Sequence, residues 1–182
     1  MISHGYKCIF LHPNKCGGKS VEKAVFGVEP VAGSADHRKP DFFVKEYGPE
    51  VWNTYFKFGF TRNPFDRMVS IYNGRIQLLN ENLPPFEKWL TKLINNHNKR
   101  QIDSHLQYDW FYYKDKPIDF IGKFENYEND FKKAVFHFNS NLELPHLNAS
   151  KRKDYKDYYN DNTKRLVTKH FEKDLDVFKY KF

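Results

Sequence analysis

An apolar segment that runs into a glycine pair between two lysines constrains this chain more than any other feature. Residues 9–11 are apolar, and the motif KCGGKS follows at residues 15–20. Apolar residues at Val21, Ala24 and Val25 then predict a helix. A strand, a tight glycine turn and a helix N-terminus in this order point backbone N–H groups at one place, and lysines add positive charge there. We therefore expect a cradle for phosphate or a close mimic of it.

This cradle is compatible with two registers. A nucleotide P-loop follows the pattern G-x-x-x-x-G-K-[ST], and residues 18–20 fit its end. The first glycine of that pattern falls on Pro13, whose fixed φ and missing N–H hinder a wide loop around a phosphate. In the second register the working lysine is Lys15, in the middle of the loop. The segment alone leaves both registers open.

A second junction between a strand and a helix carries an arginine. Residues 56–61 alternate in the manner of a strand, with aromatic side chains on one face, and Arg62 follows them. Asn63 as N-cap and Pro64 at the first helical position then predict a helix. Arg62 thus lies at the carboxyl end of a strand, where open α/β sheets bind ligands. With Ser70 two turns along the helix, it suits a second phosphate, which an arginine fork binds well.

The two junctions together resemble a known family. Residues 15–20 are similar to the 5′-phosphosulfate loop, of the K-T-G-G-T-S type, in glycan sulfotransferases that use 3′-phosphoadenosine-5′-phosphosulfate (PAPS). Residues 62–70, RNPFDRMVS, resemble the 3′-phosphate motif R-N-P-[YF]-D-R-L-V-S of the same family, the sulfotransferase-2 type. The similarity continues, in order, through residues 120–126, 147–150 and 173–180, so it extends over nearly the whole chain.

The resemblance implies that PAPS is the sulfuryl donor and that PAP is the product. The donor-binding residues that it marks are Lys15, Cys16, Gly17, Gly18, Lys19, Ser20, Arg62 and Ser70. Cys16 is expected to contribute its backbone N–H, because sulfuryl transfer needs no thiol. Two residues depart from the family pattern: Asn14 replaces a proline, which loosens the loop, and Lys19 replaces a small hydroxyl residue. The added cation either strengthens donor binding or blocks a contact made by a hydroxyl.

Sulfuryl transfer needs two further functions, a group that stabilises the departing oxygen and a base for the acceptor proton. Lys15 fits the first role. For the base we favour His37, in the polar loop at residues 34–38, because the family resemblance places a histidine of the acceptor side in this region. His105 is the alternative base, and His12, at the end of a strand, is expected to be structural.

Strands and helices are expected to alternate along the chain. The expected strands span residues 6–12, 55–61 and 118–122, and the expected helices span residues 18–26, 40–55, 64–80, 129–138 and 161–182, with a further helix after Pro84-Pro85. This order predicts an α/β fold, a three-layer P-loop-like domain with a small central parallel sheet flanked by helices. The 182 residues contain no evident linker or repeat, so a single sulfotransferase domain over residues 1–182 is expected.

Charge and composition limit the partners. A net charge of +7 suits the anionic donor and an acidic glycan. The basic run at residues 151–153 is short and Asp154 follows it, so these residues are expected to be solvated, with donor contact as the alternative, and no nucleic acid is expected. The eight histidines form no metal-ligand spacing, so no metal is expected. No signal peptide or apolar run of about 18 residues appears, so a cytoplasmic protein without a membrane span is expected.

The sequence thus predicts a PAPS-dependent sulfotransferase that acts on a hydroxyl, in a carbohydrate. A nucleotide or small-molecule kinase would use the same cradle with ATP–Mg²⁺, but it would need a strand that ends in a metal-binding aspartate, and Asp119 comes too early for that. A non-catalytic module that binds nucleotide or anionic glycan is the second alternative. A nucleic-acid binder is the third, and it would need basic residues interleaved with aromatic residues on one face. Nothing in residues 77–116 is diagnostic of a particular sugar.

Overall fold

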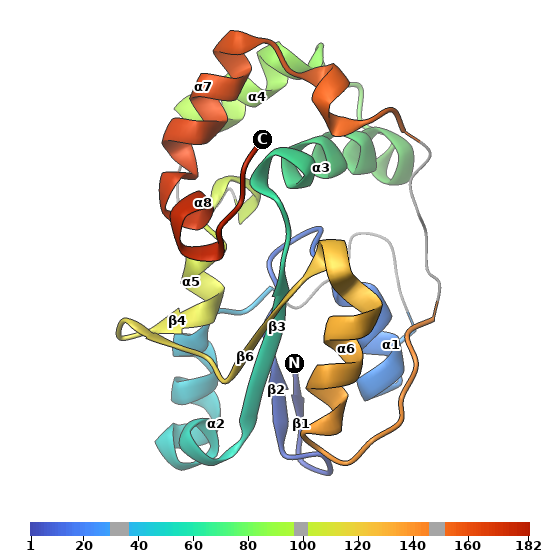
Figure 1. The fold of residues 1–182 in the computed structure, drawn as a ribbon, viewed down its shortest axis with the longest axis vertical. Coiled ribbons are helices and arrows are strands. Elements are labelled where there is room, and N and C mark those ends of the chain that lie inside the picture. The colour runs from blue at the N-terminus through green and yellow to red at the C-terminus, as the bar shows by residue number, and fades with distance from the viewer. Residues whose placement is uncertain (30–36, 97–101, 146–151) are drawn as a thin grey trace. The chain divides into compact units, whose positions relative to one another are not determined.

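The computed structural model describes residues 1–29, 37–96, 102–145 and 152–182 (Figure 1). The chain divides into two compact units. The first comprises residues 1–61 and 107–147, and the second comprises residues 62–106 and 148–182. A single sulfotransferase domain over the whole chain stays a prediction.

The first unit is built on a small mixed sheet of four strands. Their order is β1 (Ile2–Ser3), β2 (Cys8–Phe10), β3 (Phe56–Thr61) and β6 (Phe120–Lys123). The last three strands are parallel, as expected, whereas β1 is antiparallel to β2. The expectation of a purely parallel sheet was therefore wrong at this edge, because a two-residue strand is too short to show any alternation in the sequence.

Helices flank both faces of this sheet, as Figure 1 shows, with α1 (Gly18–Phe26) and α6 (Tyr127–Phe136) on one side and α2 (Pro40–Thr54) on the other. Helix α1 has the predicted bounds. Its apolar face and that of α6 pack on the aromatic face of the strands, in a core of Cys8, Phe10, Val21, Val25, Phe58, Phe60, Phe131, Ala134 and Val135. A mixed α/β fold is thus confirmed, and its three-layer, P-loop-like character stays a prediction.

A short helix and a hairpin complete the first unit. The helix α5 (Tyr108–Phe111) leads into β4 (Tyr112–Tyr113), which pairs with β5 (Lys116–Pro117) as an antiparallel ribbon. A 3₁₀ turn, η2 (Phe124–Asn126), joins β6 to α6. Phe111 of α5 packs so closely on Gly59 that a Cβ atom there would lie 2.4 Å from its ring. Glycine in β3 is therefore required by the packing of this second face.

The second unit is helical in the residues that the structure describes. Its helices are α3 (Pro64–Leu79), α4 (Phe86–Asn95), α7 (Asp161–His170) and α8 (Glu172–Phe178), with the 3₁₀ turns η1 (Ile102–Ser104) and η3 (Tyr155–Tyr158). Their apolar faces share a core that includes Phe65, Met68, Val69, Phe86, Trp89, Leu90, Leu93, Val167 and Phe171.

The helix ends of the second unit show how far local sequence decides its structure. Asn63 caps α3 as predicted, since its side-chain oxygen accepts a hydrogen bond from the Phe65 N–H at 3.1 Å. Asn160 and Thr163 form a capping box at the start of α7. The helix expected to run to the chain end instead breaks at Phe171, with φ −103° and ψ 21°. Within the described ranges, no helix is both long and apolar enough to cross a membrane.

Candidate functional site

The loop between β2 and α1 has the backbone geometry of an anion-binding nest. Gly17 is the N-cap of α1 with φ 83°, and Lys15 adopts φ 65°, which non-glycine residues rarely do. Left-handed residues that alternate with others turn successive N–H groups toward one side. The side chains of Lys15 and Lys19 are half-buried at this loop. The predicted cradle residues therefore lie around one turn at a helix N-terminus.

Close packing leaves no room for side chains at the two glycines of this loop. A Cβ atom on Gly18 would lie 2.3 Å from Nδ1 of His12, and one on Gly17 would lie 2.5 Å from the ring of Tyr127. The Tyr127 hydroxyl also donates a hydrogen bond to the Gly17 carbonyl. Burial raises the pKa of Tyr127, so this donor keeps its proton. The turn is thus held from β2 and from α6.

Cys16 takes part in the loop through its buried side chain. Its Sγ atom lies 3.3 Å from Oε1 of Gln107 and 3.7 Å from the Asn14 carbonyl oxygen. The thiol is therefore engaged in internal contacts, which agrees with a role for its backbone alone. Cys8 is fully buried on β2, as expected, and burial raises the pKa of its thiol to about 12.

A buried contact between a histidine and a carboxylate lies beside the loop. Nε2 of His12 is 3.0 Å from Oε1 of Glu22, and both side chains are buried. Burial acts to raise the pKa of Glu22, but the hydrogen bond from His12 and the charges of His12 and His37 outweigh it, so the pKa is lowered. His12 is thus structural, as expected, but its partner is a carboxylate that the sequence analysis did not single out.

His37, the predicted base, is tied to the same place. Its Nδ1 atom lies 3.2 Å from the His12 carbonyl oxygen, and its ring meets the His12 ring edge-on at 4.8 Å. A carbonyl oxygen only accepts hydrogen bonds, so Nδ1 carries the proton of the neutral ring and Nε2 keeps its lone pair. That tautomer can accept a proton from a ligand. Residues 34–36 of the predicted loop lie outside the described residues.

Contacts to α5 fix the chain around His37. The Trp110 indole N–H donates to the His37 carbonyl oxygen at 3.1 Å. Two residues on, Lys39 pairs with Asp109 at 2.9 Å, and its ammonium group lies 4.8 Å from the Trp110 ring centroid. The first unit therefore brings His37 to His12, which lies two residues after β2 and three residues before Lys15. Contacts that span 70 and 73 residues of sequence hold the chain there.

In the second unit, Arg62 and Ser70 are in direct contact. Both residues are buried, and Nη1 of Arg62 donates to Oγ of Ser70 at 3.1 Å. Nε and Nη2 of the same guanidinium lie 2.8 Å from Oδ2 of Asp66, one turn along α3. The structure thus joins the two residues that were predicted to hold a phosphate, and it adds Asp66 as their internal counter-ion.

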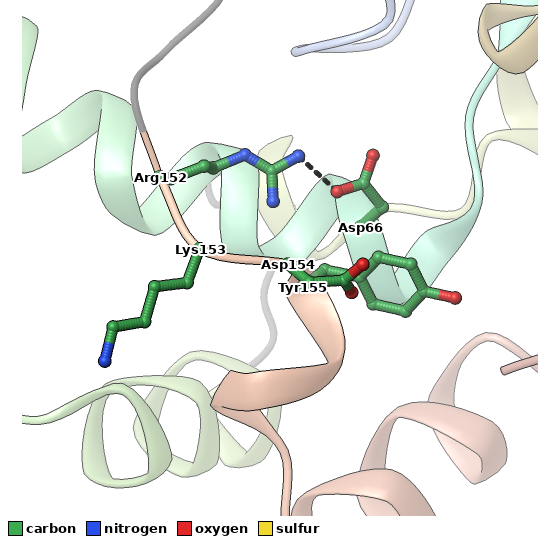
Figure 2. A pocket seen from close by; sticks show the side chains of 5 residues that line it. All are labelled: Asp66, Arg152, Lys153, Asp154 and Tyr155. Atoms are coloured by element: carbon green, nitrogen blue, oxygen red, sulfur yellow. Dashed lines mark hydrogen bonds and ion pairs between the residues drawn. The ribbon is translucent and has the colours of Figure 1, made fainter.

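Asp66 is shared with a second arginine. Its Oδ1 atom pairs with Arg152, whose side chain is mostly buried (Figure 2). These two residues line an open pocket together with Lys153, Asp154 and Tyr155, and Figure 2 shows Lys153 pointing away from the ion pair. The expectation that Arg152 is simply solvated was wrong, because its partner lies 86 residues earlier in the chain. Residues 147–151 lie outside the described residues.

The alternative base belongs to this second unit. His105 accepts, at its backbone oxygen, a hydrogen bond of 3.2 Å from Nη1 of Arg67. The Arg67 side chain is fully buried in this unit. The first unit contains both His37 and Lys15, whereas the second contains His105 and Arg62.

Glu22, Gln107 and Tyr127 were not singled out by the sequence analysis. Only Glu22 carries a local signal, since a carboxylate in the second turn of a helix repels an anion bound at the N-terminus of that helix. Gln107 and Tyr127 reach the loop across 91 and 110 residues of sequence, and no local pattern announces such contacts.

The fold and the two junctions define a mixed α/β protein with candidate anion sites at strand-to-helix turns. The model of the Sulfotransferase family matches residues 29–181, and the chain belongs to this family, of the sulfotransferase-2 type. Membership supports an enzyme that transfers sulfuryl groups. The match includes the Arg62 motif but begins after the loop at residues 15–20. Neither a curated protein nor a solved structure matches this chain.

Proposed function

We propose that this chain transfers a sulfuryl group from PAPS to a hydroxyl group of a carbohydrate and releases PAP. The observation that carries the proposal is the buried hydrogen bond between Arg62 and Ser70, inside the region that matches the sulfotransferase family. A guanidinium with a neighbouring hydroxyl suits the 3′-phosphate that distinguishes PAPS from other sulfated nucleotides.

The residues of each unit fit one anionic group of the donor. In the first unit, the left-handed conformations of Lys15 and Gly17 would direct backbone N–H groups at a 5′-phosphosulfate, and the side chains of Lys15 and Lys19 supply positive charge. In the second unit, the guanidinium of Arg62 already pairs with the carboxylate of Asp66, so its side chain is oriented to bind an anion. Cys16 and Ser20 complete the donor-binding set, the second of them as a buried residue in the first turn of α1.

PAPS would supply the activated sulfuryl group, whose bond to an oxygen of the 5′-phosphate breaks as a new bond to the acceptor oxygen forms. In this proposal, Nε2 of His37 takes the acceptor proton. The Lys15 ammonium group stabilises the negative charge on the departing phosphate oxygen. His105 would replace His37 in this role if the acceptor approached the second unit.

Ligand binding separates this proposal from its alternatives. Isothermal calorimetry compares PAP, ATP–Mg²⁺ and GTP–Mg²⁺, and we expect PAP to bind without a metal and more tightly than either nucleotide. Labelled PAPS with a panel of glycans then tests transfer. Tighter binding of ATP–Mg²⁺ would favour the kinase, and PAP binding without transfer to any hydroxyl acceptor would favour a non-catalytic module.

The two lysines of the loop distinguish the registers. Lys15→Ala should lower kcat much more than PAP affinity, because its contact strengthens in the transition state. Lys19→Ala should act mainly on donor affinity. The measurement pairs calorimetry with initial rates for both variants. A Lys15→Ala enzyme with normal turnover beside an inactive Lys19→Ala enzyme would instead support the P-loop register.

A further inference from the structure

We infer that Glu22 is a positioning residue for His37 and acts through the buried ring of His12. The inference rests on the proposed function, in which His37 accepts the proton of the acceptor hydroxyl. Glu22 does not touch the reacting atoms in this scheme. It holds His12, and His12 in turn holds the base.

The location of Glu22 needs an explanation. It is a buried carboxylate in the second turn of α1, whose N-terminus forms the anion cradle. A negative charge there opposes the binding of an anionic donor, and burying it costs free energy unless a partner compensates. The partner is His12, at 3.0 Å. Because the Glu22 carboxylate lowers affinity for the donor, we expect it to favour another step, the transfer of the acceptor proton to His37.

His12 contacts Glu22, the glycine turn of the cradle and His37. Its Nε2 atom binds Glu22, its ring fills the space against Gly18, and its ring stacks on Phe10 with centroids 4.8 Å apart. Its carbonyl oxygen accepts the hydrogen bond from Nδ1 of His37, and its ring edge packs on the His37 ring. Because stacking and the hydrogen bond to Glu22 both restrain the ring, His12 presents a fixed surface to His37.

The charge of Glu22 also acts on His37. The positive charge of His37 lowers the pKa of Glu22, and by reciprocity the carboxylate stabilises the protonated His37. Among the residues that the structure describes, other charged or titratable groups near this histidine include His12, the adjacent Arg38 and the Lys39–Asp109 pair, within which the two charges offset each other. A base that becomes an imidazolium during the reaction benefits from such a carboxylate, as it does from the one that orients the histidine in other catalytic arrangements.

Histidine-ring NMR tests the inference without any enzymatic assay. Long-range ¹H–¹⁵N spectra of the full chain should show neutral His37 protonated at Nδ1. In Glu22→Gln, the midpoint of the His37 titration should move to lower pH by about half a unit or more. An unchanged midpoint would overturn the inference. In the wild-type chain, the Glu22 side-chain ¹³C resonance should report the same His37 titration and lose it in His37→Asn, so the test stands even if Glu22→Gln does not fold.

Activity measurements supply the second arm. Glu22→Gln should lower kcat about ten- to a hundredfold and move the acid limb of the rate profile to lower pH, whereas PAP affinity should not fall. Glu22→Asp, which keeps the charge, should recover part of the rate. Glu29→Gln is the matched control, because it removes an exposed carboxylate, paired with Lys23, from the same unit and should change nothing. If no acceptor is sulfated, the proposed function fails, but the NMR titration still shows whether Glu22 and His37 are coupled.

Discussion

The loop at residues 15–20 and the arginine site at residues 62–70 hold their candidate anions in different ways. The loop is a backbone site, shaped by Gly17 and Gly18 and held by buried contacts to His12 and Tyr127. The arginine site is a side-chain site, in which Asp66 already occupies the guanidinium of Arg62. Both precede or open a helix, but at the second site the internal carboxylate of Asp66 contacts the proposed anion-binding side chain directly.

This difference has a physical consequence for binding. Backbone N–H groups of a nest are fixed dipoles, so a ligand meets them without displacing a counter-ion. At Arg62, a phosphate has to share or replace the carboxylate of Asp66. The free energy gained by pairing the phosphate with Arg62 is therefore reduced by the ion pair that the folded chain already contains. PAP affinity should therefore be most sensitive to substitutions that change the shape of the loop and to substitutions that change the charge of the arginine site.

The largest expected effect is that of His37 in the first unit. His37→Asn should lower turnover by roughly two to four orders of magnitude, the range for loss of a general base, and leave PAP binding unchanged. The acid limb of the wild-type rate profile, expected near pH 6.5, should disappear with it. Initial rates with labelled PAPS between pH 5 and 8 measure both, over about the range in which histidine titrates.

A specific outcome would move the base to the second unit. If His37→Ala kept both rate and acid limb while His105→Ala lost them, His105 would be the base. If neither histidine mattered, a carboxylate would take the proton.

The next effect tests the side-chain site. Arg62→Ala should weaken PAP binding by about 2–4 kcal/mol, because a buried charge-assisted contact to the 3′-phosphate is lost. Calorimetry with adenosine 5′-phosphosulfate, which lacks that phosphate, should show a far smaller loss. Arg165→Ala, at an exposed arginine of α7, is the control. Equal losses for the two ligands would remove Arg62 from the 3′-phosphate site.

Gly18→Ala tests the backbone site through its shape. Alanine is about 1 kcal/mol better than glycine within a helix, so propensity alone predicts stabilisation. The added Cβ would lie 2.3 Å from the His12 ring, and this overpacking should instead lower the free energy of unfolding by about 1–3 kcal/mol and weaken PAP binding. Thermal melts compare it with Gly5→Ala, where the nearest atom is 4.0 Å away. A stabilised Gly18→Ala with normal PAP affinity would contradict the geometry of the loop.

The smallest effect concerns the internal anion. Asp66→Asn should lower the free energy of unfolding by about 1 kcal/mol, because it leaves Arg62 and Arg152 without their shared carboxylate. PAP should then raise Tm by more than it does in the wild-type chain, since its phosphate takes over the role of the carboxylate. An equal or smaller rise in Tm would mean that Asp66 does not compete with the ligand.

The sequence was most informative where local rules decide the structure. The bounds of α1, the Asn63 cap of α3 and the parallel pairing of the three longer strands all follow from short patterns of apolar residues, glycine and capping residues. It failed at β1, where two residues form a strand only because β2 accepts them, and at Phe171, where packing ends α7 before the chain does. In both places tertiary contacts outweigh weak local preferences.

The sequence by itself determined the chemistry available at each junction: lysines beside a glycine turn, and an arginine two turns before a serine. Only the tertiary structure decided what supports these groups. The His12–Glu22 pair, the contact of His37 with the His12 carbonyl and the contact of Arg152 with Asp66 join residues that are 10, 25 and 86 positions apart. The physical reason is burial, because a charged or polar group inside a fold must find whichever partner packing brings to it.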